Sequence, residues 1–153
     1  MIYCFDTSGL LDGWARHYPD AVFPTLWSKV SELAHESRAI APVMVRDELR
    51  KKDDALLPWC KNAGMTFHDL DQEQQRLVKD ILGRFPRLVD TRKGRSGADP
   101  VVIALAKCRG AIVVTGELSR GTVDKPKIPD VCEAYDVKSI SFLDVVKSER
   151  WVF

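Results

Sequence analysis

The stretch that decides the fold is GADPVVIALAKCRGAIVVTGE, residues 97–117. Its first part predicts a helix, because Pro100 has the fixed φ and the missing N–H that suit a first helical turn. Its second part, from Ala111, is continuous, apolar and β-branched, which is typical of a strand covered on both faces. A helix followed by such a strand indicates a parallel sheet with helical crossovers, and therefore an α/β fold.

The rest of the chain continues this alternation of apolar runs and amphipathic segments, without internal repeats, low-complexity tracts or an obvious linker. The expected strands lie at about 2–5, 38–42, 65–70, 111–115 and 137–141. The expected helices lie within 8–19, 25–37, 43–52, 54–64, 71–85, 97–110, 128–135 and 141–149. The sequence therefore predicts one domain, residues 1–153, folded as a three-layer α/β/α sandwich around a central, mainly parallel sheet.

The composition favours a soluble cytoplasmic protein. The 153 residues suffice for one domain that buries roughly 70% of the surface of its unfolded chain. Cys4, Cys60, Cys108 and Cys132 form no C-x-x-C pair, which favours reduced thiols over a zinc site. The chain does not start like a leader peptide, and no apolar run approaches the roughly 18 residues that span a bilayer. We therefore expect no membrane association.

The charge is balanced overall but locally basic. Twenty-three Lys and Arg accompany 22 Asp and Glu, which gives a formal net charge of +1. The segment GRFPRLVDTRKGRSG, residues 83–97, nevertheless carries five basic residues and one acid. A basic patch of this kind suits a phosphodiester substrate, and an ordinary solvated loop is the alternative.

A second stretch, IYCFDTSGLL at residues 2–11, raises the question of function. An apolar strand ends on Asp6, Thr7 and Ser8, and apolar residues then resume at helical spacing. One interpretation is a helix N-cap, because these residue types accept hydrogen bonds from the free N–H groups at a helix start. The other is a ligand site, because open parallel sheets place such sites at the carboxyl ends of strands.

Three further acids decide between these interpretations. Glu48 lies on the helix after the second strand, Asp99 opens the helix before the fourth strand, and Glu117 follows the fourth strand. Together with Asp6 they are expected at one edge of the sheet. Carboxylates at close range repel one another unless protons or a cation reduce their charge. Mg²⁺ or Mn²⁺ meets this need, because both ions take hard oxygen ligands.

Each acid also has a purely structural interpretation. Glu48 precedes two lysines by one helical turn, a pairing worth a few tenths of a kcal/mol. Asp99 could serve only as a helix cap, and Glu117 only as a polar turn residue. Asp130 is a possible fifth acid, or a carboxylate at a helix N-terminus that the helix dipole stabilises.

The ordered set of motifs resembles the PIN-domain ribonucleases. The motifs are CFDTS at 4–8, RDEL at 46–49, GADPVVIALA at 97–106, VVTGE at 113–117 and KIPDVCEAYDVKSISFLDVV at 127–146. They cover almost the whole chain. The sequence looks most similar to small stand-alone proteins of the VapC-like toxin type, or to a related PIN-like branch known mainly as a domain of unknown function. The resemblance implies a three-layer α/β/α fold and a metal-dependent ribonuclease.

The resemblance also implies roles for individual residues. The positions that match the family's first three acids are Asp6, Glu48 and Asp99. Glu117 stands where many PIN domains have Asp within a T-x-D motif, so its longer side chain suggests contact with the metal through water. Thr7 or Ser8 corresponds to the hydroxyl that supports the site.

The activity that the resemblance implies is hydrolysis of phosphodiester bonds in single-stranded RNA. Mg²⁺ or Mn²⁺ would polarise a phosphoryl oxygen and activate a bound water. The candidate contacts to the RNA backbone are Arg92, Lys93 and Arg95. The resemblance further implies products with a 5′-phosphate and a 3′-hydroxyl, a homodimer, and a small antitoxin protein that inhibits in trans.

Two other classes of protein share the opening feature. A phosphatase or phosphotransfer domain would also place an Asp after the first strand, but here Thr7 and Ser8 follow Asp6 and no D-x-D pair is present. A catalytically inactive PIN-like module that binds RNA or protein stays open, because Glu117 departs from the T-x-D pattern. Manganese binding without nuclease activity would identify such a module.

Overall fold

The computed structural model describes residues 1–89, 97–117, 121–122 and 125–153. In this part of the chain five strands form one sheet in the order β3-β2-β1-β4-β5, and every neighbouring pair is parallel. The strands are β1 (Tyr3–Phe5), β2 (Ala39–Pro42), β3 (Thr66–His68), β4 (Ile112–Val114) and β5 (Ser139–Ile140). The predicted parallel sheet is thereby confirmed.

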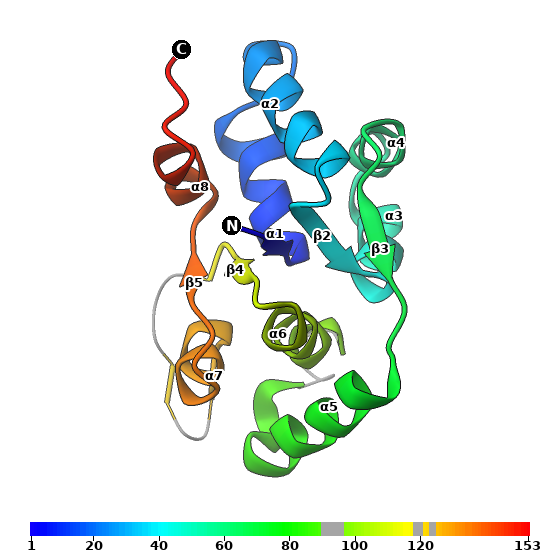
Figure 1. Ribbon diagram of the computed structural model, residues 1–153, viewed down its shortest axis with the longest axis vertical. Coiled ribbons are helices and arrows are strands. Elements are labelled where there is room, and N and C mark those ends of the chain that lie inside the picture. The colour runs from blue at the N-terminus through cyan, green and yellow to red at the C-terminus, as the bar shows by residue number, and fades with distance from the viewer. Residues whose placement is uncertain (90–96, 118–120, 123–124) are drawn as a thin grey trace.

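Helices cover both faces of this sheet, as expected for a three-layer α/β/α sandwich. They are α1 (Thr7–Leu11), η1 (Asp12–His17), α2 (Pro24–His35), α3 (Val43–Lys52), α4 (Leu56–Asn62), α5 (Gln72–Arg84), η2 (Pro86–Leu88), α6 (Ala98–Arg109), α7 (Ile128–Ala134) and α8 (Phe142–Ser148). Figure 1 shows α1, α2 and α8 on one side of the sheet, and α5, α6 and α7 on the other. The predicted fold class is confirmed.

The order of the strands brings the first and fourth strands side by side. Phe5 pairs with Val114 at the carboxyl ends of β1 and β4. The Asp6 N–H, one residue further, donates to the Val114 carbonyl at 3.0 Å. The residues that follow these two strands therefore lie together, although more than a hundred positions separate them in the sequence.

Helix α6 is the central helix of the second layer. Most of its side chains are buried around its whole circumference, namely Ala98, Pro100, Val101, Val102, Ile103, Ala104, Leu105 and Ala106. It packs between the sheet and α5, which explains why its sequence lacks a polar face. The Cys4 thiol of β1 donates to its Val102 carbonyl at 3.6 Å, within the core.

Two glycines permit close packing of the first helical segment. A Cβ on Gly9 would lie 2.3 Å from the Val114 carbonyl oxygen, so only glycine allows α1 to sit this close to β4. A Cβ on Gly13 would lie 2.7 Å from the Phe142 ring of α8. The expected single helix at 8–19 is two segments, because η1 is a π-helix in which the Tyr18 N–H donates to the Gly13 carbonyl.

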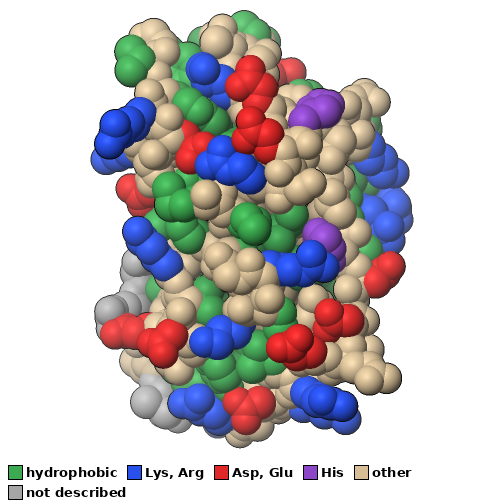
Figure 2. All heavy atoms as spheres, viewed as in Figure 1, with side chains coloured by type: hydrophobic (Ala, Val, Ile, Leu, Met, Phe, Trp, Pro, Cys, Tyr) green, Lys and Arg blue, Asp and Glu red, His purple; other side chains and the backbone are tan. Residues whose placement is uncertain are grey.

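Charges of both signs are mixed on the surface. Figure 2 shows Lys and Arg side chains interspersed with Asp and Glu over the face in view. Among the described residues, no helix combines the length and the apolar character that crossing a bilayer requires.

Candidate functional site

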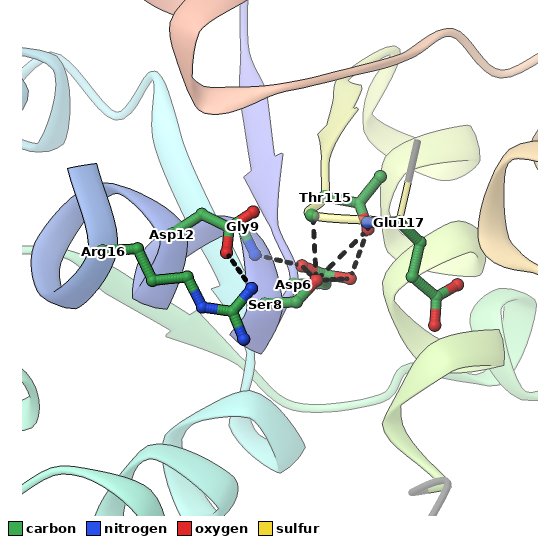
Figure 3. A network of polar contacts seen from close by, with 8 residues as sticks. Asp6, Ser8, Gly9, Asp12, Arg16, Thr115 and Glu117 are labelled. Atoms are coloured by element: carbon green, nitrogen blue, oxygen red, sulfur yellow. Dashed lines mark hydrogen bonds and ion pairs between the residues drawn. The ribbon is translucent and has the colours of Figure 1, made fainter. Parts of the chain in front are cut away.

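Asp6 occupies the centre of the candidate site, directly after β1. It is the N-cap of α1, because its Oδ1 accepts a hydrogen bond from the Gly9 N–H at 2.6 Å. Its carboxylate also accepts hydrogen bonds from two hydroxyls (Figure 3). The Ser8 hydroxyl lies 2.8 Å from Oδ1, and the Thr115 hydroxyl lies 2.8 Å from Oδ2. Asp6 is therefore both a helix cap and the acceptor of a polar network that extends to β4.

Burial controls the charge of Asp6. The residue is only 4% exposed, and this loss of hydration raises the pKa of its carboxyl to about 6. Hydrogen bonds from Gly9, Thr115 and Ser8 lower the pKa, and the charge of Glu117 raises it. None of the ion pairs of the described residues involves Asp6. At neutral pH the protein thus holds a buried negative charge that forms no ion pair with a Lys or Arg of the described part.

The turn after β4 orients the two hydroxyls. The Gly116 N–H donates to the Ser8 Oγ at 2.9 Å, and the Glu117 N–H donates to the Thr115 Oγ1 at 3.0 Å. Each hydroxyl oxygen already accepts from a backbone amide, so its single hydrogen is available for Asp6. The sequence Thr115-Gly116-Glu117 therefore fixes the carboxylate of Asp6 through its backbone as well as its side chains.

The carboxylate of Glu117 is engaged elsewhere. Its Oε2 accepts a hydrogen bond from the Ile128 N–H at 3.0 Å, at the start of α7. In Figure 3 its side chain extends away from Asp6. The charge of Glu117 still acts on Asp6, whose pKa it raises. Glu117 thus links the site to α7, a role that was not expected from its sequence position.

Asp12 and Arg16 lie beside the Asp6 network and come from η1. The Asp12 Oδ1 and the Arg16 Nη1 form an ion pair at 3.1 Å. Asp12 packs against the turn after β4, because a Cβ on Gly116 would lie 2.4 Å from the Asp12 Oδ2. In Figure 3 this pair lies on the opposite side of Asp6 from Glu117.

Asp99 and Glu48 come from helices whose N-terminal parts lie together. A Cβ on Gly97 would lie 3.2 Å from the Met44 Cε, which places the start of α6 beside the start of α3. The expectation that Asp99 caps its helix is wrong. Gly97 is the N-cap with helical backbone angles, so α6 begins earlier and Asp99 lies in its first turn. Glu48 lies 4.0 Å from Lys52, the distance between Oε2 and Nζ.

The donor set fits a hard divalent cation only in part. Asp6 offers an ionisable carboxylate with no ion-pair partner among the described residues, and oxygen is the ligand that Mg²⁺ and Mn²⁺ prefer. Within the described residues, however, no three His, Cys, Asp or Glu side chains lie close enough to hold a metal ion. Metal binding by Asp6 therefore stays a prediction. Ligation by Glu48, Asp99 and Glu117 stays a prediction.

Comparison with known families gives a match over almost the whole chain. The model of a domain of unknown function, DUF4411, matches residues 3–153. The chain belongs to the DUF4411 family. No curated protein matches the chain. The DUF4411 match includes all candidate acids of the site, from Asp6 to Asp130.

The remaining predicted site residues of this DUF4411 member differ in their contacts. Ser8 is the hydroxyl that contacts Asp6, whereas the Thr7 Oγ1 is buried without a hydrogen-bond partner in the described part. The Asp130 Oδ2 accepts from the N–H groups of Gly121 and Lys127, at 2.7 and 2.9 Å. Asp130 thus acts at the start of α7, as its structural interpretation states. The candidate RNA contacts Arg92, Lys93 and Arg95 lie outside the described residues.

Sequence reasoning missed three residues of the site. Thr115 could have been found, because it is the last residue of the strand expected at 111–115, within the VVTGE motif, and hydroxyls often orient carboxylates. Asp12 and Arg16 follow Asp6 within the first helical segment. The place of Asp12 beside Gly116 depends on the π-helix and on the pairing of β1 with β4, which no local pattern in this DUF4411 chain indicates.

Proposed function

We propose that the protein is a metal-dependent endoribonuclease that hydrolyses phosphodiester bonds of single-stranded RNA with Mg²⁺ or Mn²⁺. The observation that carries the proposal is Asp6, a buried carboxylate at the carboxyl end of a central parallel strand, without an ion-pair partner among the described residues. This is the edge at which open α/β sheets bind their ligands. The PIN resemblance of the surrounding motifs supplies the reaction class.

The residues around Asp6 perform two tasks in this proposal. Ser8 and Thr115 hold the carboxylate in one orientation through hydrogen bonds of 2.8 Å. Burial keeps water from the carboxylate and makes an unneutralised charge unfavourable, which favours a bound cation. When bound, Mg²⁺ or Mn²⁺ supplies polarisation of a phosphoryl oxygen and a water of lowered pKa.

The proposed ligands extend from Asp6 to three other acids. Asp99 is proposed to complete the site from the first turn of α6, and Glu48 from the middle of α3, a helix whose start adjoins that of α6. Glu117 is proposed to act through water, because one of its oxygens holds the α7 amide of Ile128. No histidine or serine nucleophile is required for this reaction.

The biological setting follows from the PIN resemblance alone. We propose a toxin of a toxin–antitoxin pair that acts in the cytoplasm as a homodimer, with a small antitoxin protein as its inhibitor. A small overlapping upstream reading frame would support this setting.

One observation favours a second candidate function. Glu117 departs from the T-x-D pattern and caps α7, and the described residues include no group of three potential ligands. These features suit a catalytically inactive PIN-like module that binds RNA or protein. Such a module would keep the fold and the Asp6 network but would not turn over RNA.

Cleavage and metal binding together separate the two candidates. Labelled single-stranded RNA is incubated with Mg²⁺ or Mn²⁺, or with EDTA, and the melting temperature is recorded with and without Mn²⁺. The ribonuclease proposal predicts cleavage that EDTA abolishes, and a melting temperature that Mn²⁺ raises because it binds only the folded state. Asp6→Asn should remove both effects. The exposed Asp54→Asn, which makes the same chemical change outside the network, should keep both.

Each remaining outcome contradicts a part of the proposal. A wild-type protein that binds Mn²⁺ but leaves RNA intact is the inactive module. Asp6→Asn protein that cleaves RNA as fast as wild type places the catalytic centre elsewhere.

A further inference from the structure

The ion pair between Asp12 and Arg16 places a guanidinium group beside the Asp6 network. The Arg16 side chain is 73% exposed, whereas the Asp12 side chain is only 17% exposed. The acid is thus held within the protein and the guanidinium stands in solvent. An exposed helical pair of this type, four residues apart, contributes only a few tenths of a kcal/mol to stability, so stability does not account for the arrangement.

Asp12 is fixed by the same turn that fixes Asp6. Its Oδ2 lies against Gly116, where a Cβ would come within 2.4 Å. The Gly116 N–H donates to the Ser8 Oγ, and the Ser8 hydroxyl donates to Asp6. The chain of contacts Asp6–Ser8–Gly116–Asp12–Arg16 is therefore continuous from the buried carboxylate to the exposed guanidinium. Figure 3 shows Asp12 and Arg16 beside Asp6 and Ser8.

We propose that Arg16 binds a backbone phosphate of the RNA at the candidate site, and that Asp12 is the residue that positions it. The inference rests on the proposed ribonuclease function and names a substrate contact for it. Arg16 has five N–H donors in a planar fork, and Asp12 engages it through Nη1. The remaining donors can bind phosphate oxygens, and a guanidinium is the side chain best shaped for that contact.

The local charge also favours such a contact. The protein has a formal net charge of +1, so its overall field attracts RNA only weakly. Without a bound metal ion, the carboxylates of Asp6 and Glu117 repel a phosphate that approaches the site. The guanidinium of Arg16, which Asp12 holds beside the Asp6 network, offsets part of this repulsion.

Substitution of Asp12 distinguishes a positioning role from simple electrostatics, because the two predict opposite changes in the affinity for RNA. Asp12→Asn removes a negative charge near the site, so electrostatic attraction alone would tighten RNA binding. If Asp12 positions Arg16, the same substitution weakens RNA binding, because the guanidinium loses its fixed orientation. A purely structural role would change neither the affinity for RNA nor its dependence on salt.

The experiment measures RNA affinity and turnover in parallel. The dissociation constant of a labelled single-stranded oligoribonucleotide is determined in EDTA at several salt concentrations, and kcat and KM are determined with Mn²⁺. Arg16→Ala should weaken binding about fivefold, the loss expected for one hydrogen-bonded contact. It should lower the slope of log Kd against log salt by about 0.7, the value for one phosphate of a single strand. KM should rise while kcat stays nearly unchanged, and Arg16→Lys should restore part of the affinity.

The pair of Asp47 and Arg50 on α3 is the matched control. It is a helical ion pair with the acid first and an exposed arginine, at 3.6 Å between Oδ1 and Nη1, and its acid also pairs with Arg46. Arg50→Ala and Asp47→Asn make the same changes of charge, and we expect neither to alter KM by more than twofold, the scatter of such assays. An equal loss of affinity in Arg16→Ala and Arg50→Ala overturns the inference, because any surface cation would then suffice.

Failure of the inference differs from failure of the proposed function. If the wild type cleaves RNA and Arg16→Ala binds and cleaves it equally well, only the role of Arg16 is overturned. Tighter binding by Asp12→Asn overturns the positioning role of Asp12. If the wild type neither binds nor cleaves single-stranded RNA, the ribonuclease proposal and this inference both fail.

Discussion

Asp6 shows how one side chain combines a local and a long-range role. As an N-cap it satisfies the Gly9 amide, and Asn would do this about as well. As a buried carboxylate it accepts the hydroxyl hydrogens of Ser8 and Thr115. Only the second role depends on its charge, so substitution by Asn separates the two.

Asp6→Asn should stabilise the metal-free protein above about pH 6. In the folded state the pKa is about 6, compared with 3.8 for an ordinary Asp. Between these values the folded protein keeps a proton that the unfolded chain has lost, so stability falls as pH rises from about 4 to 6 and then stays level. The difference corresponds to about 3 kcal/mol at most. Asn cannot ionise and lacks this loss.

Urea denaturation in EDTA at pH 4, 5, 6 and 7 measures this effect. The free energy of unfolding of Asp6→Asn relative to wild type should rise across this range, and Asp54→Asn should show no such trend. If the Asp6→Asn protein is less stable than wild type by the same amount at pH 4 and at pH 7, burial of the Asp6 charge does not lower the free energy of unfolding.

At the scale of elements, the start of α1 is positioned by its contact with β4. Gly9 lies so close to the Val114 carbonyl that a Cβ would stand 2.3 Å from the oxygen. The neighbouring Ser8 reaches Asp6 and the Gly116 amide from this position. A shift of α1 therefore also disturbs the Asp6 network.

Gly9→Ala should destabilise the protein by about 1–3 kcal/mol, because the added methyl group forces α1 away from β4. Gly83 in α5 is the matched control, since a Cβ there meets nothing within 4 Å. Gly83→Ala should instead stabilise the protein by up to about 1 kcal/mol, as alanine favours helix. Chemical denaturation measures both, and equal effects of the two substitutions would contradict the close packing of α1.

The elements themselves could be predicted from local patterns. The strand at 112–114 was evident from its β-branched apolar run, and the helix at 98–109 from Pro100 near its start. The helix at 56–62 was correctly ended near Gly64, whose φ of 78° only glycine adopts readily. These features depend on near neighbours in the sequence, which is why single-sequence reasoning finds them.

The candidate site was harder to predict from local sequence patterns. Asp6 was identified by its place after β1, but the α7 contact of Glu117 requires the path of the chain from 117 to 128. The place of Asp12 at the site is known only from its close approach to Gly116 in the structure. The contacts of Asp6 with Thr115 and of Asp12 with Gly116 join residues about 100 positions apart in the sequence, and no periodic pattern encodes them.

At the scale of the whole molecule, a second polar network ties the end of α8 to the start of the sheet. Arg38, which precedes β2, donates from Nη2 to both carboxylate oxygens of Glu149, at 2.6 and 2.8 Å. The Tyr3 hydroxyl of β1 donates to the Glu149 Oε2 at 2.9 Å. Burial and the Glu149 carboxylate raise the pKa of Tyr3 to about 12. Glu149 therefore links three segments of the chain.

Glu149→Gln should destabilise the protein by about 1–2 kcal/mol, because it removes the charge from a hydrogen-bonded pair that is mostly buried. The Glu149 side chain is 11% exposed. Glu36 also pairs with Arg38, but it is 57% exposed, so Glu36→Gln should change the stability by less than about 0.5 kcal/mol. Thermal denaturation of both variants measures this difference in stability. If Glu149→Gln and Glu36→Gln lose the same stability, the stabilisation depends on the charge of Arg38 and not on the burial of Glu149.

The position of β1 between β2 and β4 also has a consequence for protein synthesis. On the ribosome β1 emerges first, and β2 becomes available early to pair with one of its edges. The other edge waits for β4, and Asp6 waits for Thr115, which is translated 109 residues later. Pairing across such a distance is a late event in folding. The nascent chain therefore carries Asp6 without the hydroxyl of Thr115 while the intervening residues are made, and the complete network forms only when synthesis has passed β4.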